Sequence, residues 1–478
     1  MEFEVVIGLE IHAELKTRGK LFTWTANEFG GEPNTRIDVI TLGMPGVLPV
    51  LNRKAVDYTL AAGLAMNCKI NRYSRFDRKH YFYPDLPKGY QISQKDYPLC
   101  YDGWIEFDVN GEVRRCRINR IHLEEDAGKS IHAEGRDDVT WVDFNRCGVP
   151  LIEIVSEPDL RSPEEAIAYW RAVKEILEYL DVSDCNMEEG SFRCDANISL
   201  RPRGSQEFGI RTELKNMNSF RFVQQALEYE VKRQAEILRS GGQVVQETRL
   251  FDVERGVTRG MRGKEEASDY RYFPEPDLVP IEIDEEWIER IRRSLPELPR
   301  AKRLRFMEQY GLPEQDVIVL TGTRALADYY EAVAQSCGDP KAAANWVMGD
   351  LIGFLREAGR SIEDSPVGPE ALAEMIRMIQ DGTISGRIAK EVLEQMVATG
   401  KSATQIVEEK GLRQISDVTQ IEAWIDQVIA ENPAQVEQYR SGKTKVLGYF
   451  VGQVMRLSRG KANPQQVNAL LRKKLDQQ

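Results

Sequence analysis

The chain has 478 residues, which suggests about three domains, and its 42% hydrophobic and 29% charged residues are typical of a globular protein in water. The net charge of −12 argues against indiscriminate binding to nucleic acid. There is no apolar run of about 18 residues, so we expect no membrane span, and we see no signal peptide at the start. Seven scattered cysteines without a CxxC pair predict free thiols and a cytoplasmic location.

The stretch Val5–Lys16 alternates between apolar and polar residues, which predicts a half-buried β-strand. The apolar set is Val5, Ile7, Leu9, Ile11, Ala13 and Leu15. Glu10, His12 and Glu14 fall on the other face, where neighbours two residues apart stand side by side, so Glu10 and His12 can converge on one ion. Taken alone, the stretch is explained more simply by an exposed sheet face with ordinary polar residues.

The region up to residue 293 is predicted to mix strands and helices. Strands are expected at Ile37–Leu42, Trp104–Val109, Val113–Leu123, Val139–Phe144, Leu151–Val155 and Ala196–Leu200. Helices are expected at Arg53–Met66, Pro163–Tyr179 and Phe220–Ser240. Ser162 stands before Pro163, as expected for an N-cap followed by proline at the first helical position.

The pattern becomes helical after the proline-rich segment Leu295–Pro299. Apolar residues recur at spacings of three and four in Ala325–Ser336, Ala342–Glu357, Pro369–Gln380 and Ser385–Val397. A further boundary is expected near residue 405. The sequence therefore predicts domains at 1–293, 294–405 and 406–478.

Carboxylates recur in the predicted strands. The run His122–Asp126 ends one strand, and Glu153 interrupts an otherwise apolar one, where a lone carboxylate is costly to bury unless it is paired or bound to a metal. With Glu10 and His12, these residues offer mostly oxygen ligands and one nitrogen, which suits magnesium or manganese better than zinc. Solvated strand edges are the alternative. Alternation would put Glu124 beside His122, but the pattern does not separate Glu124 from Glu125.

A second polar group could bind a phosphorylated, metal-bearing ligand. Met187–Asn197 combines acids, a hydroxyl, a guanidinium and an amide, and Glu213 and Lys215 follow it. A polar turn with local hydrogen bonds is the simpler alternative. The segments Gly400–Ser402 and Gly442–Thr444 resemble the end of a P-loop but lack its earlier glycine. The sequence contains no tandem-serine amidase signature and no convincing Cys–His nucleophile pair. If this protein consumes ammonia, we therefore expect that it does not produce it.

The C-terminal stretch is basic although the whole chain is acidic. From Arg440 onward, nine basic residues face the single acidic residue Asp476, a net charge of +8. This charge predicts a docking surface for a polyanion. A solvated helical face is the alternative.

Long motifs carry a resemblance to a known family. They include VIGLEIHAELKT, LGMPGVLPVLN, FDRKHYFYPDLPKGYQISQ, HLEEDAGKS, GVPLIEIVSEPDLRSPEEA, MEEGSFRCDANISLRP and, near the end, VGQVMRLSRGKANPQQVN. Over essentially its whole length, the chain resembles the GatB family, the B subunits of tRNA-dependent amidotransferases.

The resemblance implies an α+β cradle-shaped catalytic domain related to glutamine synthetase, an all-α helical domain and a small all-α tail domain. It implies ATP-dependent conversion of Glu-tRNA(Gln) to Gln-tRNA(Gln), and of Asp-tRNA(Asn) to Asn-tRNA(Asn), through phosphorylation of the carboxylate. Ammonia would come through a tunnel from a glutaminase A subunit, and a small C subunit would complete a heterotrimer. A non-catalytic tRNA-binding adaptor and a free-standing ammonia ligase are the rival hypotheses.

The resemblance also implies site residues. The metal ligands for Mg²⁺ or Mn²⁺ fall on Glu10, His12, Glu125 and Glu153. This set favours Glu125 over Glu124, which requires an irregular strand end, because regular alternation would place Glu124 beside His122. The chemistry of the implied reaction gives the expected catalytic residues, which are Lys79, Tyr81, Glu125, Arg193 and Lys215. The basic C-terminal stretch gives the expected tRNA-binding residues, which are Lys443, Lys445, Arg456, Arg459 and Lys461.

One feature departs from the family pattern. Many relatives carry FCxC and CxxC motifs that bind zinc. This chain has Thr23, Thr25, Asp38 and Thr41 at those places. We therefore expect no zinc.

Overall fold

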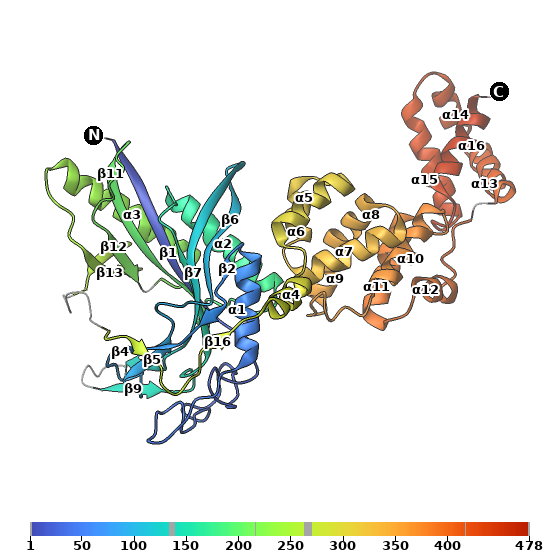
Figure 1. The fold of residues 1–478 in the computed structure, drawn as a ribbon. Coiled ribbons are helices and arrows are strands. Elements are labelled where there is room, and N and C mark those ends of the chain that lie inside the picture. The colour runs from blue at the N-terminus through green and yellow to red at the C-terminus, as the bar shows by residue number, and fades with distance from the viewer. Residues whose placement is uncertain (1, 133–138, 216, 262–269, 416, 477–478) are drawn as a thin grey trace. The chain divides into compact units, whose positions relative to one another are not determined.

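The structure is a computed structural model that describes residues 2–132, 139–215, 217–261, 270–415 and 417–476. It divides into two compact units, Met1–Arg300 and Ala301–Gln478. The first unit is built on a large sheet and the second is helical (Figure 1), which confirms the predicted mixture of α and β followed by an all-α region.

A nine-stranded sheet organises the first unit, with strand order β14-β13-β12-β11-β1-β10-β7-β6-β2. Its strands are β1 (Phe3–Glu14), β2 (Lys69–Ile70), β6 (Cys100–Val109), β7 (Glu112–Glu125), β10 (Pro150–Ser156), β11 (Phe192–Pro202), β12 (Thr212–Lys215), β13 (Glu247–Asp252) and β14 (Val257–Gly260). Only β12 and β13 pair in parallel; the other neighbours are antiparallel. The predicted N-terminal strand therefore lies inside the sheet, between β10 and β11.

Helices pack against the sheet and share one hydrophobic core with the apolar face of β1. They are α1 (Arg53–Ala65), α2 (Pro163–Tyr179) and α3 (Phe220–Arg239), followed by the peripheral α4 (Glu285–Ser294). Ile7, Leu9 and Ile11 are fully buried in this core, as the alternation predicts. Ser162 caps α2 by accepting from the backbone N–H of Glu165, also as predicted. The opposite face of β1 is left for polar side chains.

Three small sheets complete the first unit. One joins β15 (Phe273–Pro274), β4 (Asp77–His80) and β5 (Tyr90–Ser93), and β5 contacts β7. The others pair β16 (Ile281–Glu282) with β3 (Tyr73–Ser74) and β8 (Lys129–His132) with β9 (Thr140–Asp143).

The predicted strand Ile37–Leu42 is wrong, because these residues form turns. The Asp38 carboxylate accepts from the backbone N–H groups of Ile40 and Thr41, each at 2.8 Å. A side chain that bonds to nearby backbone in this way competes with a strand.

The second unit contains α5 (Pro299–Tyr310, whose first residues precede the division), α6 (Glu314–Leu320), α7 (Arg324–Cys337), α8 (Pro340–Asn345), α9 (Ile352–Glu357), α10 (Pro369–Gln380), α11 (Gly386–Thr399), α12 (Ala403–Glu409), α13 (Val418–Glu431), α14 (Pro433–Arg440), α15 (Leu447–Leu457) and α16 (Pro464–Asp476). The predicted helix Ala342–Glu357 is interrupted by a π-helical turn at Trp346–Leu351. Two separate hydrophobic clusters stabilise this unit, one within 306–407 and one within 421–475. No helix in the described ranges is long and apolar enough to cross a membrane.

Candidate active site

The polar face of β1 places Glu10, His12 and Glu14 on the side of the sheet away from its helical core. Because β1 is paired on both sides, each residue has a cross-strand neighbour within reach. His12 stands opposite Glu153 of β10 and Arg193 of β11. The sheet register thus gathers groups that are far apart in the sequence.

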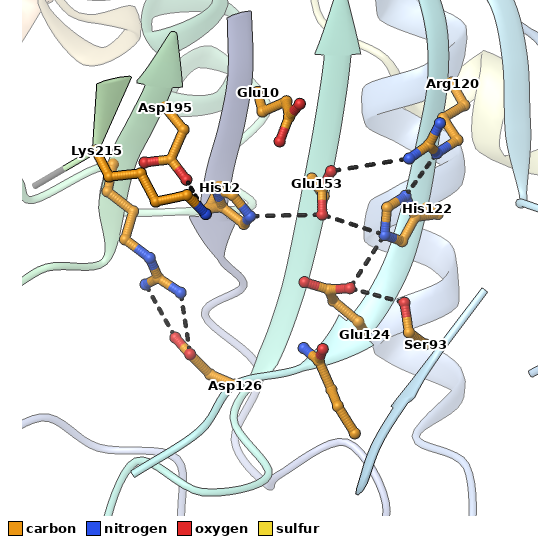
Figure 2. Close-up of polar contacts among 12 residues, drawn as sticks. Glu10, His12, Ser93, Arg120, His122, Glu124, Asp126, Glu153, Asp195 and Lys215 are labelled. Atoms are coloured by element: carbon orange, nitrogen blue, oxygen red, sulfur yellow. Dashed lines mark hydrogen bonds and ion pairs between the residues drawn. The ribbon is translucent and has the colours of Figure 1, made fainter. Parts of the chain in front are cut away.

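A first cluster joins His12, Glu124 and Glu153, whose ligand atoms lie within 4.8 Å of one another. The His12 Nε2 atom is 3.5 Å from Glu153 Oε2, and His122 Nε2 is 3.4 Å from the same oxygen (Figure 2). Two carboxylates and an imidazole that converge in this way can hold a divalent cation.

Glu124 is held in place by two hydrogen bonds. His122 Nε2 is 3.0 Å from Glu124 Oε2, and the Ser93 hydroxyl donates to the same oxygen at 2.7 Å. The Arg120 Nε–H donates to His122 Nδ1, which leaves the Nε2–H of His122 to face Glu124. His122 therefore orients Glu124 instead of offering a free nitrogen to an ion.

A second cluster joins Glu10, Asp195 and Glu213 from three adjacent strands. The Asn197 amide donates to Glu10 Oε1 at 2.9 Å, and Lys215 Nζ lies 3.4 Å from Asp195 and 3.3 Å from Glu213. The two clusters are adjacent, because Glu10 and His12 are two residues apart on β1. Lys215 is the cationic side chain of this second cluster.

The electrostatics of the clusters are set by burial and by neighbouring charges. Burial, followed by the charges of Glu153, Glu213 and Asp195, raises the pKa of Glu10. Burial alone would lower the pKa of His12, but its hydrogen bond and charge interaction with Glu153 give a net increase. Burial opposes ionisation of Glu153, but His122 and His12 hold its pKa below the ordinary value. Without a cation, Glu10 and His12 thus retain protons to higher pH than free side chains do.

Glu125 is not part of either cluster, in contrast to the expectation for a metal ligand. Its carboxylate pairs with Lys88 and accepts from the backbone N–H of Ile92 at 3.0 Å. The pairing of β7 with β10 is regular from Arg120 to Glu125, so neighbouring residues point to opposite faces. The expected irregular strand end is absent from these residues, and Glu124 occupies the place expected for Glu125.

Arg193 lies beside the first cluster but is already paired. Its guanidinium makes two bonds of 3.0 Å with Asp126, and its NH1 atom is 3.9 Å from Glu14. Burial and the Asp126 charge raise the pKa of Glu14 to about 8. Arg193 therefore neutralises the buried Asp126, and its role as a ligand of phosphate oxygens is not supported by this arrangement.

Lys79 and Tyr81 lie near the first cluster, at the end of β4 and in the loop after it. The Lys79 ammonium is 4.8 Å from the centre of the Tyr270 ring and 5.8 Å from that of Tyr81. Burial opposes the charge of Lys79, but the charge of Glu124 contributes to a net rise in its pKa. Burial, with a smaller contribution from Glu124, also raises the pKa of Tyr81, so its hydroxyl stays protonated at neutral pH.

Sequence reasoning missed several members of the site. It did not assign roles to Ser93, Arg120, His122 or Asp195, and it left Glu124 as an open alternative. The signal for Glu124 was present, because strict alternation along β7 puts it beside His122. Alternation along β11 would likewise have placed Asp195 on the polar face, although only the pairing of β1 with β11 puts it opposite Glu10.

The basic residues of the tail lie around α15. Arg456 is in its last turn, and Arg459 has a φ of 54° in the turn that leads through Gly460 to Asn463. Asn463 accepts from the N–H groups of Gln465 and Gln466 at the start of α16, so the chain turns here between α15 and α16. Four of the five predicted tRNA-binding side chains are exposed: Lys443, Lys445, Arg456 and Arg459. Lys461 is half-buried.

The chain matches known proteins over nearly its whole length. The family model described as GatB/GatE catalytic domain matches residues 5–289, and the one described as GatB domain matches residues 328–475. The B subunit of the aspartyl/glutamyl-tRNA(Asn/Gln) amidotransferase of Carboxydothermus hydrogenoformans is 57% identical over 477 residues, 99% of each chain. The proteins of the same name from Geotalea daltonii and Moorella thermoacetica are 57% and 56% identical, over 99% of this chain and 100% of each relative.

Proposed function

The chain belongs to the GatB family, and we propose that it is the amidotransferase component that converts Glu-tRNA(Gln) to Gln-tRNA(Gln) with the consumption of ATP. Asp-tRNA(Asn), which the names of the relatives also imply, is its second substrate. The observation that carries this proposal is the convergence of His12, Glu124 and Glu153 on the open face of the sheet. A purely tRNA-binding adaptor would gain nothing from gathering buried carboxylates, because like charges held together destabilise the fold.

The reaction activates a carboxylate for attack by ammonia. The carboxylate alone reacts poorly, because an oxide would have to leave. When its oxygen attacks the γ-phosphorus of ATP, ADP leaves and an acyl phosphate forms. Ammonia then attacks the carbonyl carbon, phosphate leaves, and the nitrogen loses a proton. Phosphoryl transfer depends mainly on positioning and on charge stabilisation, which side chains of this site can provide.

The donor set of the site fits a hard divalent cation. His12, Glu124 and Glu153 of the first cluster, with Glu10 of the adjacent second cluster, offer carboxylate oxygens and one imidazole nitrogen, as Mg²⁺ or Mn²⁺ prefers. Such a cation, when bound, supplies positive charge next to the phosphate oxygens. The protein's own contribution is to fix the donors in position, which the hydrogen bonds around Glu124 do before any ligand arrives. In this proposal Glu124 replaces Glu125.

The cationic side chains near the two clusters have separate roles. Lys79 sits next to the first cluster and stabilises negative charge on the transferred phosphoryl group. Lys215, beside the second cluster, contacts phosphate oxygens of ATP. Tyr81 covers Lys79 and limits the access of water, which would hydrolyse the acyl phosphate. Arg193 positions Asp126 and so supports the wall of the site.

The proposed assembly is a cytoplasmic heterotrimer. A glutaminase-type A subunit releases ammonia, a closed tunnel delivers it, and a small C subunit completes the complex. The relatives are each named as one component of a larger amidotransferase, which supports a multi-subunit enzyme. The first unit forms a cradle of the glutamine synthetase type, a proposal supported by its large sheet with one polar face.

We propose that the chain binds no zinc. Asp38 Oδ2 accepts from the hydroxyls of Thr23, Thr25 and Thr41, at 2.8, 2.6 and 2.8 Å. One carboxylate with three hydroxyls lacks the thiolate and imidazole donors of structural zinc sites. The hydrogen bonds around Asp38 connect the same segments that a metal would hold.

The basic surface around α15 binds the tRNA backbone. Exposed Lys and Arg side chains supply affinity for phosphates without reading bases. In the part of the chain that the structure describes, no carboxylate is ion-paired with any of the five predicted residues. Their charges are therefore available to a polyanion.

The experiment that tests the function uses the complex reconstituted with its A and C subunits. Wild-type complex should form Gln-tRNA from Glu-tRNA, ATP and glutamine, and also from free ammonia. His12→Ala should abolish both reactions, whereas glutamine hydrolysis by the partner persists. Near-normal amidation by His12→Ala would contradict the assignment of catalysis to this site.

A further inference from the structure

Four tyrosines form a row of rings beside the small sheet of β4, β5 and β15. Tyr81 and Tyr83 follow β4, and Tyr270 and Tyr272 precede β15. The Tyr81 ring centre lies 6.0 Å from that of Tyr83 and 6.2 Å from that of Tyr270, which is 5.9 Å from Tyr272, and all three contacts are edge-to-face. The end members Tyr83 and Tyr272 are 61% and 36% exposed, so their rings are accessible to a ligand.

The backbone holds the two halves of the row together. β4 pairs with β15, and beyond this ladder the His80 N–H donates to the Tyr270 carbonyl at 3.0 Å. The His80 Nδ1 atom lies 3.1 Å from the Arg271 carbonyl oxygen, and the Tyr81 N–H donates to the Gly89 carbonyl at 3.2 Å. Rings that are fixed before a ligand arrives lose little conformational entropy when it binds.

The row lies beside the first cluster. The Lys79 ammonium is 4.8 Å from the centre of the Tyr270 ring. Burial opposes the charge of Lys79, but the charge of Glu124 and then that of Tyr272 contribute to the net rise in its pKa. Burial raises the pKa of Tyr272, and the charge of Lys79 opposes this rise. Lys79 is therefore a common neighbour of the rings and of the carboxylates.

An exposed cation stands over the last ring of the row. The Lys95 Nζ atom is 5.5 Å from the centre of the Tyr272 ring. Asp77, which accepts the backbone N–H of Lys95, and the next residue, Asp96, both pair with Arg75. Among the residues that the structure describes, no ion pair involves the Lys95 ammonium. Its charge is therefore available to an anion.

We propose that this row binds the unpaired 3′ end of the aminoacyl-tRNA, with terminal bases stacked on the tyrosine rings and a phosphate at Lys95. The inference rests on the proposed amidotransferase function and assigns one part of its substrate to particular residues. Sites for single-stranded nucleic acid combine aromatic rings, on which bases stack, with cations that bind the backbone. The row provides both.

The chemistry of the substrate calls for such a site close to Lys79. The reacting carboxylate belongs to an amino acid that is esterified to the terminal nucleotide, so the terminal bases must lie next to the place of phosphoryl transfer. Stacking adds affinity without a large positive charge, which suits a chain with a net charge of −12. Exposed tyrosines also occur at protein interfaces, but lysine is depleted there, so the free Lys95 favours a polyanion.

The test compares unacylated tRNA(Gln) with the same tRNA lacking its last three nucleotides, both bound to the reconstituted complex. Tyr83→Ala and Tyr272→Ala should each weaken binding of the intact tRNA by about tenfold, the scale of one lost base–aromatic contact. Neither should weaken binding of the shortened tRNA, because the contact is already absent from it. Lys95→Gln should lower the slope of log Kd against log salt by about 0.7, again with the intact tRNA only.

Matched variants separate stacking from other effects. Tyr272→Phe keeps the ring and should bind intact tRNA like wild type. Tyr73→Ala removes a 42% exposed tyrosine whose edge-to-face partner, Tyr97, lies outside the row, and it should change no affinity. In kinetic assays, Tyr83→Ala and Tyr272→Ala should raise the KM for Glu-tRNA. The KM for ATP, glutamine hydrolysis and the thermal unfolding midpoint should stay near wild type.

Four outcomes overturn the assignment. Unchanged tRNA affinity in both tyrosine variants, or an equal loss with intact and shortened tRNA, would mean that the row does not contact the 3′ end. A raised KM for ATP alone would assign the rings to the base of ATP, and dissociation of the A or C subunit would assign them to a protein interface. If one tyrosine variant does not fold, the other decides, because it lies on a separate segment. Failure of the proposed function is distinguishable, since it would appear as amidation that survives His12→Ala, whereas tRNA binding is measured without turnover.

Discussion

Glu124 and Glu125 are adjacent in the chain, but their carboxylates point to opposite faces of β7. Glu124 belongs to the first cluster and is hydrogen-bonded to His122 and Ser93, whereas Glu125 pairs with Lys88. Both are almost fully buried. The same chemical change at these two positions should therefore have different consequences.

Glu124→Gln should reduce amidation by about 100-fold or more, because it removes a charged donor from the first cluster. Its affinity for Mn²⁺, measured by titration of the complex, should fall in parallel. Glu125→Gln should instead lower stability by about 3 kcal/mol, since it leaves Lys88 buried without its counter-charge. Urea unfolding measures this loss.

A double variant provides the control for Glu125. In Glu125→Gln with Lys88→Met, the unpaired charge is gone, so stability should recover much of the loss. Mn²⁺ affinity should stay close to wild type in both backgrounds. If Glu125→Gln abolished Mn²⁺ binding and Glu124→Gln did not, the ligand set proposed from the geometry would be wrong.

The protonation states of Glu10 and His12 predict how cation binding depends on pH. The pKa values of both groups are raised above their ordinary values, so without a cation they hold protons that must leave when it binds. Mn²⁺ affinity should therefore rise between about pH 6 and about pH 8, with proton release detectable by calorimetry in buffers of different ionisation enthalpy. A flat affinity over this range would contradict the involvement of His12.

Much of the fold follows from local sequence patterns. The alternation along β1 predicted both its buried face and its polar face, and the Ser162–Pro163 signal gave the start of α2. The strand predicted at Ile37–Leu42 is wrong. Its apolar residues suggested a strand, whereas the hydrogen bonds that the Asp38 carboxylate accepts from the backbone depend on side-chain geometry. Local patterns predict a helix or strand well where the burial pattern and the capping residues indicate the same element.

The site was harder to predict because it depends on strand register. Alternation could place His12 and Glu153 on strand faces, but only the pairing of β1 with β10 makes them neighbours. The choice of Glu125 depended on an irregular strand end that the regular ladder does not contain.

The group around Asp38 gives a prediction about stability. Asp38 accepts five hydrogen bonds, three from threonine hydroxyls and two from backbone N–H groups. Although burial opposes it, these bonds hold the pKa of Asp38 below its ordinary value. Asp38→Asn should lower the free energy of unfolding by about 1 to 2 kcal/mol at neutral pH, a value reduced for partial exposure.

The pH dependence of this effect has a defined sign. A carboxyl group with a lowered pKa in the folded state stabilises the fold at pH values above its pKa in the unfolded state. This contribution disappears as the pH falls through its pKa in the folded state. The difference between wild type and Asp38→Asn should therefore shrink below about pH 4. Asp102→Asn, in an exposed pair with Lys69, should change stability little at either pH. Equal effects of the two substitutions at neutral pH would show that the Asp38 bonds do not support the fold.

The basic surface around α15 gives the last prediction. Arg456 and Arg459 are exposed and Lys461 half-buried, and tRNA phosphates should replace counterions there. Replacing all three by Gln should weaken Glu-tRNA binding and make log Kd less dependent on log salt by about two to three units of slope. Lys341→Gln with Arg360→Gln removes two exposed charges outside the tail and serves as the control. Affinity measured over a salt series distinguishes the cases: parallel slopes for wild type and the triple variant would mean that tRNA phosphates are bound elsewhere.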